Sequence, residues 1–319
     1  MSESADKKSP KIAVFGDLVL DLYTIGEISR ISPEAPVPVL EVRRREQRLG
    51  GSGNVILNLN ELGADVFAAG RIGHDLHGKV IRKEFEDREI KDDMVLENAN
   101  LPTITKNRMV AQNQQLLRID EERIEFLTEE EETRILEQFQ KVVVDLDALV
   151  LSDYGKGFLS DSLLKSLLST AKKSGCPVVV DPKGVDFRKY KSATVITPNF
   201  KEASLAASRA RSLNEIATTL LEDAELDFLL ITRSQDGISH FENREEELFH
   251  EQHPVQVQEV TDVTGAGDTV VAIVAYGLAM GWDRSKICEW CNYAAGYVVG
   301  HFGATTITME QLEALVPNE

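Results

Sequence analysis

The sequence predicts an α/β protein with three α/β/α layers around a mainly parallel sheet, together with a small β-sheet lid. Short apolar, β-branched runs alternate with longer helical patterns along most of the chain. These runs are apolar at almost every position, as expected of strands that are covered on both faces. Two regions interrupt this alternation and predict strands that no helix separates, which indicates a second sheet.

The expected core strands are continuous apolar runs, and they lie at 11–15, 65–69, 148–152, 177–180, 193–197 and 227–232. The expected helices have apolar residues at helical spacing, and they lie near 54–62, 76–87, 129–144, 159–174, 201–209 and 213–222. Thr128 followed by Glu131 predicts a capping box at the start of the third helix. We therefore expect one domain over residues 11–319, after a disordered polar tail of residues 1–10.

The lid is expected from residues 36–44 and 103–119. Both segments are rich in β-branched residues but have no helical pattern between neighbouring strands. Pro36 and Pro38 favour an edge strand, because proline cannot donate to a ladder. Residues 242–247 are expected to form a solvated turn between two edge strands.

Charge and length exclude several classes of protein. The 319 residues include 35 Lys and Arg against 53 Asp and Glu, a net charge of −18, which argues against non-specific binding to nucleic acid or anionic membranes. The longest apolar run, residues 270–280, is far shorter than the ~20 residues that span a bilayer. With no apolar segment at the start of the chain, a cytoplasmic protein is expected.

Polar or charged residues follow the expected strands. Asp17 follows the first, Asp153 the third, Asp181-Pro-Lys183 the fourth, Asn199 the fifth and Arg233 the sixth. Because ligands of open α/β sheets bind at the carboxyl ends of the strands, these residues predict one polar crevice. The alternative is that such residues only begin loops or cap helices.

The segment from Val260 to Val270 contains the strongest chemical signal. Gly265, Ala266 and Gly267 precede an apolar run that predicts a buried helix, so backbone N–H groups there can surround an anion. Asp268 lies in the same turn. A carboxylate beside an anion hole suits phosphoryl transfer, in which it accepts the proton of an attacking hydroxyl. The simpler alternative is that Asp268 only caps the helix.

The segment Asp262-Val-Thr-Gly-Ala-Gly-Asp268 resembles the C-terminal signature of the ribokinase-like (PfkB) sugar kinases, and Gly50-Gly-Ser-Gly-Asn54 resembles their N-terminal di-glycine motif. The resemblance implies that Asp268 is the catalytic base and that Gly265, Ala266 and Gly267 form the anion hole. It implies that Glu202, in Asn199-Phe-Lys-Glu202, organises Mg²⁺ through water. It also implies sugar-binding positions at Gly51 and Asn54 and nucleotide-binding positions at Asn199, Thr232, Arg233, Gly237, Gly265, Gly267 and Asn292.

Further motifs resemble those of a narrower group, the kinase domains that act in ADP-heptose synthesis. They are Gly16-Asp-Leu-Val-Leu-Asp21, residues 30–38, residues 113–118, Leu151-Ser-Asp-Tyr-Gly-Lys-Gly157 and Asp181-Pro-Lys-Gly184. This resemblance implies ATP-dependent phosphorylation of the anomeric hydroxyl of D-glycero-D-manno-heptose 7-phosphate. The residues expected to bind this sugar phosphate are Asp17, Asp21, Gly51, Asn54, Asp153 and the cations Arg108, Arg118, Lys156 and Lys183, with Lys106 a weaker candidate.

The resemblance also implies ATP as co-substrate, Mg²⁺ as cofactor and a homodimer formed through the lids; it leaves open a requirement for a monovalent cation. Nucleotidylyltransferase domains of related proteins use an H-x-G-H motif, which His301-Phe-Gly-Ala304 does not match, so we expect no such domain. Two alternatives remain: a kinase of the same fold for another sugar or nucleoside, and a non-catalytic sugar-phosphate sensor. A dehydrogenase is disfavoured because Gly51-Ser-Gly53 lacks the third glycine of the dinucleotide fingerprint.

Other patterns are interpreted as structural. Cys288-Glu-Trp-Cys291 has C-x-x-C spacing, but no second Cys or His pair accompanies it in the sequence, so packed thiols are expected. His74 and His77 are expected on a surface loop. Residues 73–79 have P-loop spacing, but Val80 stands where a P-loop needs Ser or Thr for Mg²⁺.

Overall fold

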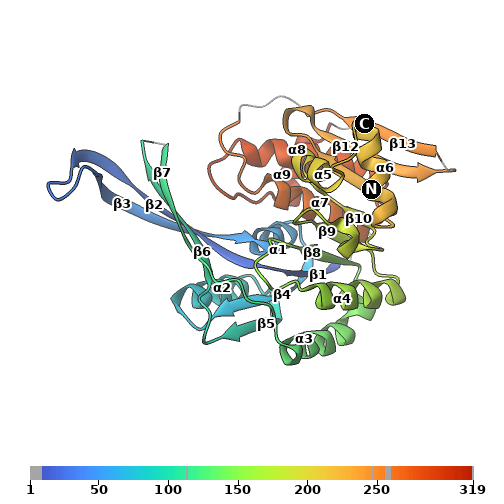
Figure 1. Cartoon of the computed structure of the whole chain (residues 1–319), viewed down its shortest axis with the longest axis horizontal. Helices are drawn as coiled ribbons and strands as arrows, with labels where there is room; N and C mark the ends of the chain where they lie inside the picture. Colours follow the sequence, from blue (N-terminus) through green and yellow to red (C-terminus); the bar gives the residue numbers. More distant parts are fainter. Residues whose placement is uncertain (1–8, 113, 246, 256–259, 318–319) are drawn as a thin grey trace, which may run out of the picture.

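The computed structural model describes residues 9–112, 114–245, 247–255 and 260–317. A nine-stranded sheet crosses the body of the molecule in the order β13-β12-β11-β10-β9-β8-β1-β4-β5, and a four-stranded sheet, β3-β2-β6-β7, extends from one side of it (Figure 1). Neighbouring strands from β11 to β5 are parallel, whereas β12 and β13 are added antiparallel at one edge. The predicted three-layer fold with a small second sheet is confirmed.

The large sheet contains β1 (Lys11–Gly16), β4 (Asp65–Gly73), β5 (Lys91–Asn98), β8 (Ala148–Ser152), β9 (Val178–Asp181), β10 (Val195–Ile196), β11 (Phe228–Thr232), β12 (Ile238–Arg244) and β13 (Glu247–His253). The helices are α1 (Ser52–Glu61), α2 (Leu76–Asp87), α3 (Glu129–Val142), α4 (Asp161–Ser174), α5 (Phe200–Ala206), α6 (Leu213–Asp223), α7 (Ala266–Ala279), α8 (Arg284–Val299) and α9 (Met309–Leu315). All six core strands and all six helices predicted from the sequence are present, with β10 shorter than expected. The predicted capping box joins Thr128 and Glu131.

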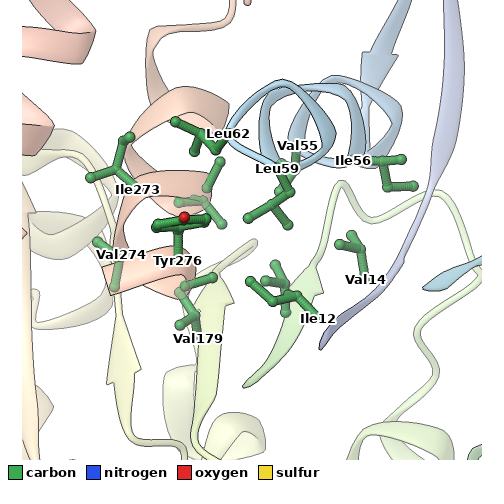
Figure 2. Close-up of a cluster of buried hydrophobic side chains, with 14 of the residues drawn as sticks. Ile12, Val14, Val55, Ile56, Leu59, Leu62, Val179, Ile273, Val274 and Tyr276 are labelled. Atoms are coloured by element: carbon green, nitrogen blue, oxygen red, sulfur yellow. The ribbon is translucent and has the colours of Figure 1, made fainter. Parts of the chain in front are cut away.

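Alternate residues of β1 enter two different hydrophobic cores. Ile12 and Val14 pack in the core that contains α1, α2, α7, α8 and α9, and Figure 2 shows them with Val55 and Leu59 of α1. Ala13 and Phe15 pack in the opposite core, with α3, α4, α5 and α6. Because successive side chains of a strand point to opposite faces, a strand between two helical layers must be apolar throughout. This is the pattern that predicted the sheet.

The second sheet forms the lid, and its longest strands are β2 (Leu18–Ile31) and β3 (Pro38–Gly51). Strands β6 (Ile104–Ala111) and β7 (Gln114–Glu121) complete it, with β6 parallel to β2. The predicted segments 36–44 and 103–119 both belong to this sheet, but β2 was missed. Its first half is buried in the body and its last residues are exposed, so no single hydrophobic period runs through it. Residue 113 of the predicted lid, and residues 1–8 of the predicted tail, lie outside the described residues.

The expectation for residues 242–247 was wrong in part. Residues 242–244 continue β12, and residue 247 begins β13; residue 246 lies outside the described part. Glu242 is only 4% exposed and contacts the guanidinium groups of Arg244 and Arg284. A carboxylate can be buried here because these two cations, which the sequence pattern did not reveal, offset its charge.

Among the described residues, no helix combines the length and the apolar character that crossing a membrane requires. The three cysteines are buried and form no disulfide, as the sequence predicted.

Candidate active site

Helix α7 begins at the glycine-rich turn that the sequence singled out. Gly265 has a left-handed conformation with φ of 84°, and no side chain caps the helix. Within the described residues, no hydrogen bond reaches the N–H groups of Gly267 and Asp268. A Cβ atom placed on Gly267 would meet nothing within 4 Å. The turn therefore presents free donors, at the positive end of a helix dipole, to open space.

The Asp268 carboxylate is buried and held by two donors. Asn54 Nδ2 donates to its Oδ2 at 2.8 Å, and the Tyr154 hydroxyl donates to its Oδ1. Burial raises the pKa of Asp268 to about 6, against the opposing effect of these two hydrogen bonds. A carboxylate with such a pKa is ionised at neutral pH but is a stronger base than an exposed aspartate. Its two partners fix the direction in which it points.

Tyr154 belongs to a loop that Asp17 holds in place. The Asp17 carboxylate accepts hydrogen bonds from the backbone N–H groups of Tyr154, Lys156 and Phe158, at 3.1, 3.0 and 3.1 Å. Asp153, at the end of β8, accepts from Lys189 Nζ at 2.7 Å and from the Tyr190 hydroxyl at 2.6 Å. The structure thus gives both aspartates, which were predicted to bind sugar, a share in shaping the loop beside Asp268.

A cleft of about 190 Å³ lies in front of this turn, at the carboxyl ends of β8, β9 and β10. Its lining includes Asp153, Tyr154, Asp181, Lys183, Asn199, Glu202, Gly265, Gly267 and Asp268. The polar crevice that the strand ends predicted is present in part, since Asp153, Asp181, Lys183 and Asn199 line it but Asp17 and Arg233 are not among its lining residues. Asp181 was predicted at this crevice as a strand-end residue but was assigned no role, and Tyr154 was named only within a motif. Tyr154 closely follows the end of β8, which is the sequence signal that could have identified it.

Four carboxylates, those of Asp153, Asp181, Glu202 and Asp268, line this cleft and give it the character of a cation site. Burial raises the pKa of Asp181 well above its ordinary value, with Asp268 and Glu202 adding to the effect and Lys183 opposing it. Lys183 Nζ lies 3.5 Å from Glu202 Oε1. Mg²⁺ prefers oxygen ligands and keeps several waters, so carboxylates beside an open cleft fit this ion. Glu202 also forms a capping box with Asn199, which positions its side chain at the start of α5.

Four cations gather near the junction of the lid and the body. Burial lowers the pKa of the Lys106 ammonium; Asp21 opposes this, and Lys156, Arg108 and Arg118 lower it further. Arg108 forms an ion pair with the buried Asp21 at 2.5 Å. Lys106 Nζ lies 5.6 Å from the centre of the Tyr154 ring, which links this group to Asp268. Such a cluster is suited to a dianionic phosphate.

The predicted nucleotide positions do not all meet at one place. Asn199, Gly265 and Gly267 line the cleft, but Asn292 lines a larger cavity of about 1140 Å³ with His253 and Pro254. Asn292 Nδ2 donates to the His253 carbonyl at 2.8 Å. Arg233 bonds Gln252 at 2.8 Å and Asp236 at 3.2 Å, and Thr232 forms a bridge with Asn199. Gly237 has φ of 79°, and a Cβ there would strike the His253 carbonyl.

The two sheets and their helices form the ribokinase fold, which two solved structures share with this chain. Arabidopsis thaliana ribokinase, in a complex with ribose and ATP, superposes with a TM-score of 0.74 at 20% identity, covering 97% of this chain and 99% of that one. Phosphofructokinase-2 from Escherichia coli, in complex with potassium, gives a TM-score of 0.77 at 18% identity, over 97% and 98% of the two chains.

The chain belongs to the pfkB family of carbohydrate kinases, whose profile matches residues 9–312. It is 40% identical over 311 residues to the bifunctional protein HldE of Helicobacter hepaticus, which covers 96% of this chain and 64% of that protein. The HldE protein of Escherichia fergusonii is 41% identical over 309 residues, with 96% and 63% covered. The chain thus spans a little under two thirds of these relatives. The family predicted from the sequence motifs is confirmed, and the protein is a sugar kinase.

Proposed function

We propose that this kinase transfers the γ-phosphoryl group of ATP to the anomeric hydroxyl of D-glycero-D-manno-heptose 7-phosphate, giving the 1,7-bisphosphate. The motifs that resemble heptose 7-phosphate kinases support this substrate, as does the 40% identity with HldE proteins along almost the whole chain. The observation that carries the proposal is the position of the lid cations. Arg108 lies two residues from Lys106 on β6 and pairs with Arg118 of β7, and Lys106 faces the ring of the same Tyr154 that holds Asp268.

Asp268 acts as the general base. Its ionised carboxylate takes the proton of the anomeric hydroxyl, whose oxygen then attacks the γ-phosphorus in line. The bond between that phosphorus and the bridging oxygen breaks, and ADP leaves with the bond's electrons. The N–H groups of Gly267 and Asp268 stabilise the negative charge on the transferred group, because they have no partner among the described residues and belong to two residues that line the cleft.

Asp181 and Glu202 would hold Mg²⁺, Glu202 through water. When bound, this ion supplies charge neutralisation to the phosphate oxygens. Lys183, beside Glu202, would contact the same phosphates or the distal phosphate of the sugar. Asp21 and Asn54 would bind sugar hydroxyls, since both are buried polar side chains with remaining hydrogen-bonding capacity.

We also propose a homodimer formed through the lid. Strand β7 is exposed along its whole length, and Leu116, Leu117 and Ile119 are 44–57% exposed on it. The lid also carries the exposed Val37 and Val42. An exposed edge strand with apolar side chains readily associates with a second copy. Light scattering coupled to size exclusion would give twice the chain mass for a dimer, and the chain mass alone would contradict it.

Mass spectrometry of the reaction product tests the proposed substrate. The enzyme is incubated with Mg·ATP and, separately, with heptose 7-phosphate, unphosphorylated heptose, ribose, fructose 6-phosphate and a nucleoside. We expect a bisphosphate from heptose 7-phosphate and a much lower rate with the others. Faster turnover of another acceptor would show that the proposed substrate is wrong, while the assignment as a kinase would stand. Tight binding of heptose 7-phosphate without release of ADP would instead support a sensor.

A further inference from the structure

Two histidines and a cysteine that are far apart in the sequence meet beside the antiparallel edge of the large sheet. His240 lies on β12, His253 ends β13, and Cys288 lies on α8. One ligand atom from each side chain lies within 4.8 Å of the other two. This cluster is separate from the Asp268 cleft and takes no part in the phosphoryl transfer described above.

The hairpin register explains how the cluster forms. In the β12–β13 ladder His240 pairs with Glu251, and His253 lies two residues further along β13. Residues that pair across strands, and those two apart on one strand, share a face of the sheet. Helix α8 packs against both strands and brings the buried Cys288 to that face. The hairpin forms the edge of the sheet in Figure 1.

Three buried ring nitrogens of these histidines have no hydrogen-bond partner among the described residues. His240 is 1% exposed, yet neither of its ring nitrogens has a hydrogen-bond partner among the described residues, and the same is true of His253 Nε2. His240 lies between the rings of Phe228 and Phe249, with centroids 5.7 and 5.6 Å away. Buried polar groups are almost always satisfied, so these nitrogens call for a ligand.

Glu251 supplies a fourth donor. Its Oε2 lies 3.4 Å from His253 Nε2 and 4.0 Å from His240 Nδ1. On the far side of His240, Glu242 Oε2 lies 3.7 Å from Nε2. A carboxylate behind a metal-binding histidine orients the ring and fixes its tautomer, and Glu242 has the position for that role. The set contains two imidazoles, one thiol and one carboxylate.

We propose that His240, His253, Cys288 and Glu251 bind one divalent transition-metal ion of the Zn²⁺ class in a tetrahedral structural site. Two nitrogens and a sulfur favour zinc over magnesium or calcium, which prefer oxygen. Bonds of about 2.0–2.3 Å place tetrahedral ligands about 3.3–3.8 Å apart, so the cluster must contract by about 1 Å. His253, which ends its strand, and the partly exposed Glu251 can make this movement.

The neutral state of His240 suits a metal ligand, whereas the Cys288 thiol must lose its proton to bind. Burial lowers the pKa of His240 to about 4, and Arg284 and His253 lower it further, so its ring is neutral as a ligand must be. Burial raises the pKa of the Cys288 thiol to about 12, with Glu251 and Asp283 adding to this effect. Binding of the metal therefore displaces one proton from Cys288. The cations Arg244 and Arg284 are offset by Glu242, which they both contact.

The site would stabilise one wall of the larger cavity. That cavity is lined by Glu251, His253 and Asn292, and the His253 carbonyl holds the Asn292 side chain. A metal that joins β13 to α8 would fix these residues relative to each other. The expected result of binding is a more stable protein rather than a new reaction.

Cobalt provides the test, because a thiolate bound to Co²⁺ gives a charge-transfer absorption. The full-length protein is treated with a chelator, freed of it and titrated with Co²⁺ and then Zn²⁺. We expect saturation at about one ion per chain, a thiolate charge-transfer band, the intense visible bands of tetrahedral cobalt, and their loss when Zn²⁺ displaces it. A spectrum without the thiolate band would overturn the proposal.

Cys291 provides a matched control. It lies on the same helix and is equally buried, but its thiol donates to the Val270 carbonyl at 3.7 Å and belongs to no part of the cluster. Cys288→Ser should abolish the band, and Cys291→Ser should retain it; the reverse result refutes the assignment. Should Cys288→Ser fail to fold, His253→Gln decides. It should weaken Zn²⁺ affinity about 100-fold or more with an unchanged circular dichroism spectrum, and undiminished affinity would overturn the site.

Discussion

Asn54 Nδ2 donates a hydrogen bond to Asp268 Oδ2 at 2.8 Å, which joins residues 214 positions apart in the sequence. Asn54 lies in the first turn of α1, after the di-glycine segment, and Asp268 lies in the first turn of α7. The two glycine-rich motifs of the sequence are therefore parts of one site. The bond explains why the N-terminal motif accompanies the C-terminal signature, since it helps aim the carboxylate.

Asp268→Asn should reduce kcat by roughly 10²–10⁴, because removal of a general base costs a factor of this size. Asparagine is nearly the same size, so the cleft and the affinity for ATP should be preserved. Steady-state kinetics and a calorimetric titration with ATP measure the two quantities. A kcat within a few-fold of the unchanged enzyme would remove Asp268 from the role of base.

The pH profile of kcat/KM should fall on its acid side through about pH 6, the pKa of Asp268. The sign follows from the role: the base must be ionised, so activity is present above this pKa and is lost as the pH falls through it. Tyr154→Phe removes a hydrogen bond that lowers the pKa of Asp268, so this limb should move to higher pH. If Tyr154→Phe leaves the acid limb of the profile unchanged, that limb belongs to a group other than Asp268.

Gly267→Val should lower kcat by about 10² or more, by analogy with the loss of an oxyanion donor. The Cβ at this position meets no other atom, so the melting temperature should change little while the side chain fills the cleft. Gly265→Ala is the contrasting variant. Its φ is 84°, and its Cβ would lie 2.7 Å from Asn54 Nδ2, so it should lower stability as well as activity. Retained activity in Gly267→Val would exclude the proposed anion hole.

Arg108→Gln should raise the KM for heptose 7-phosphate at least tenfold and change the KM for ATP little, since a charge-assisted contact to the distal phosphate is lost. Arg43→Gln is the control, because Arg43 also lies on the lid but pairs with Glu27 in solvent. Unphosphorylated heptose isolates the contribution of the phosphate. On that substrate, the KM of Arg108→Gln should differ less from the KM of the unchanged enzyme. Equal effects on both sugars would assign Arg108 to the structure of the lid.

The sequence predicted the elements whose environment is uniform and missed those whose environment changes along their length. Strand β8 is buried throughout and was predicted with its observed bounds, whereas β2 passes from the core to the exposed lid and was missed. In the site, the sequence identified the turn around Gly265 because two glycines precede a long apolar run there. A helix cap alone does not need two glycines, so an anion-binding turn was the better interpretation. Asp181 was predicted at the crevice but given no role, and Tyr154 was not singled out, because many other polar residues follow a strand in the same way.

The cluster of His240, His253 and Cys288 shows the limit of spacing arguments. Cys288 was correctly predicted to be a buried thiol, but the sequence offered no histidine pair near it. The histidines reach it only through the register of a hairpin and the packing of α8 against that hairpin. No local pattern encodes this arrangement. His74, which was expected on a loop, is exposed and contacts Glu97, as a surface residue would.

The most direct test of the account is a crystal structure of the protein with a non-hydrolysable ATP analogue and heptose 7-phosphate. We predict that the anomeric oxygen lies about 2.6–3.2 Å from the Asp268 carboxylate, with the terminal phosphorus facing the N–H groups of Gly267 and Asp268. A complex with the lid closed in which the phosphorus or the anomeric oxygen lies far from this turn would contradict the account.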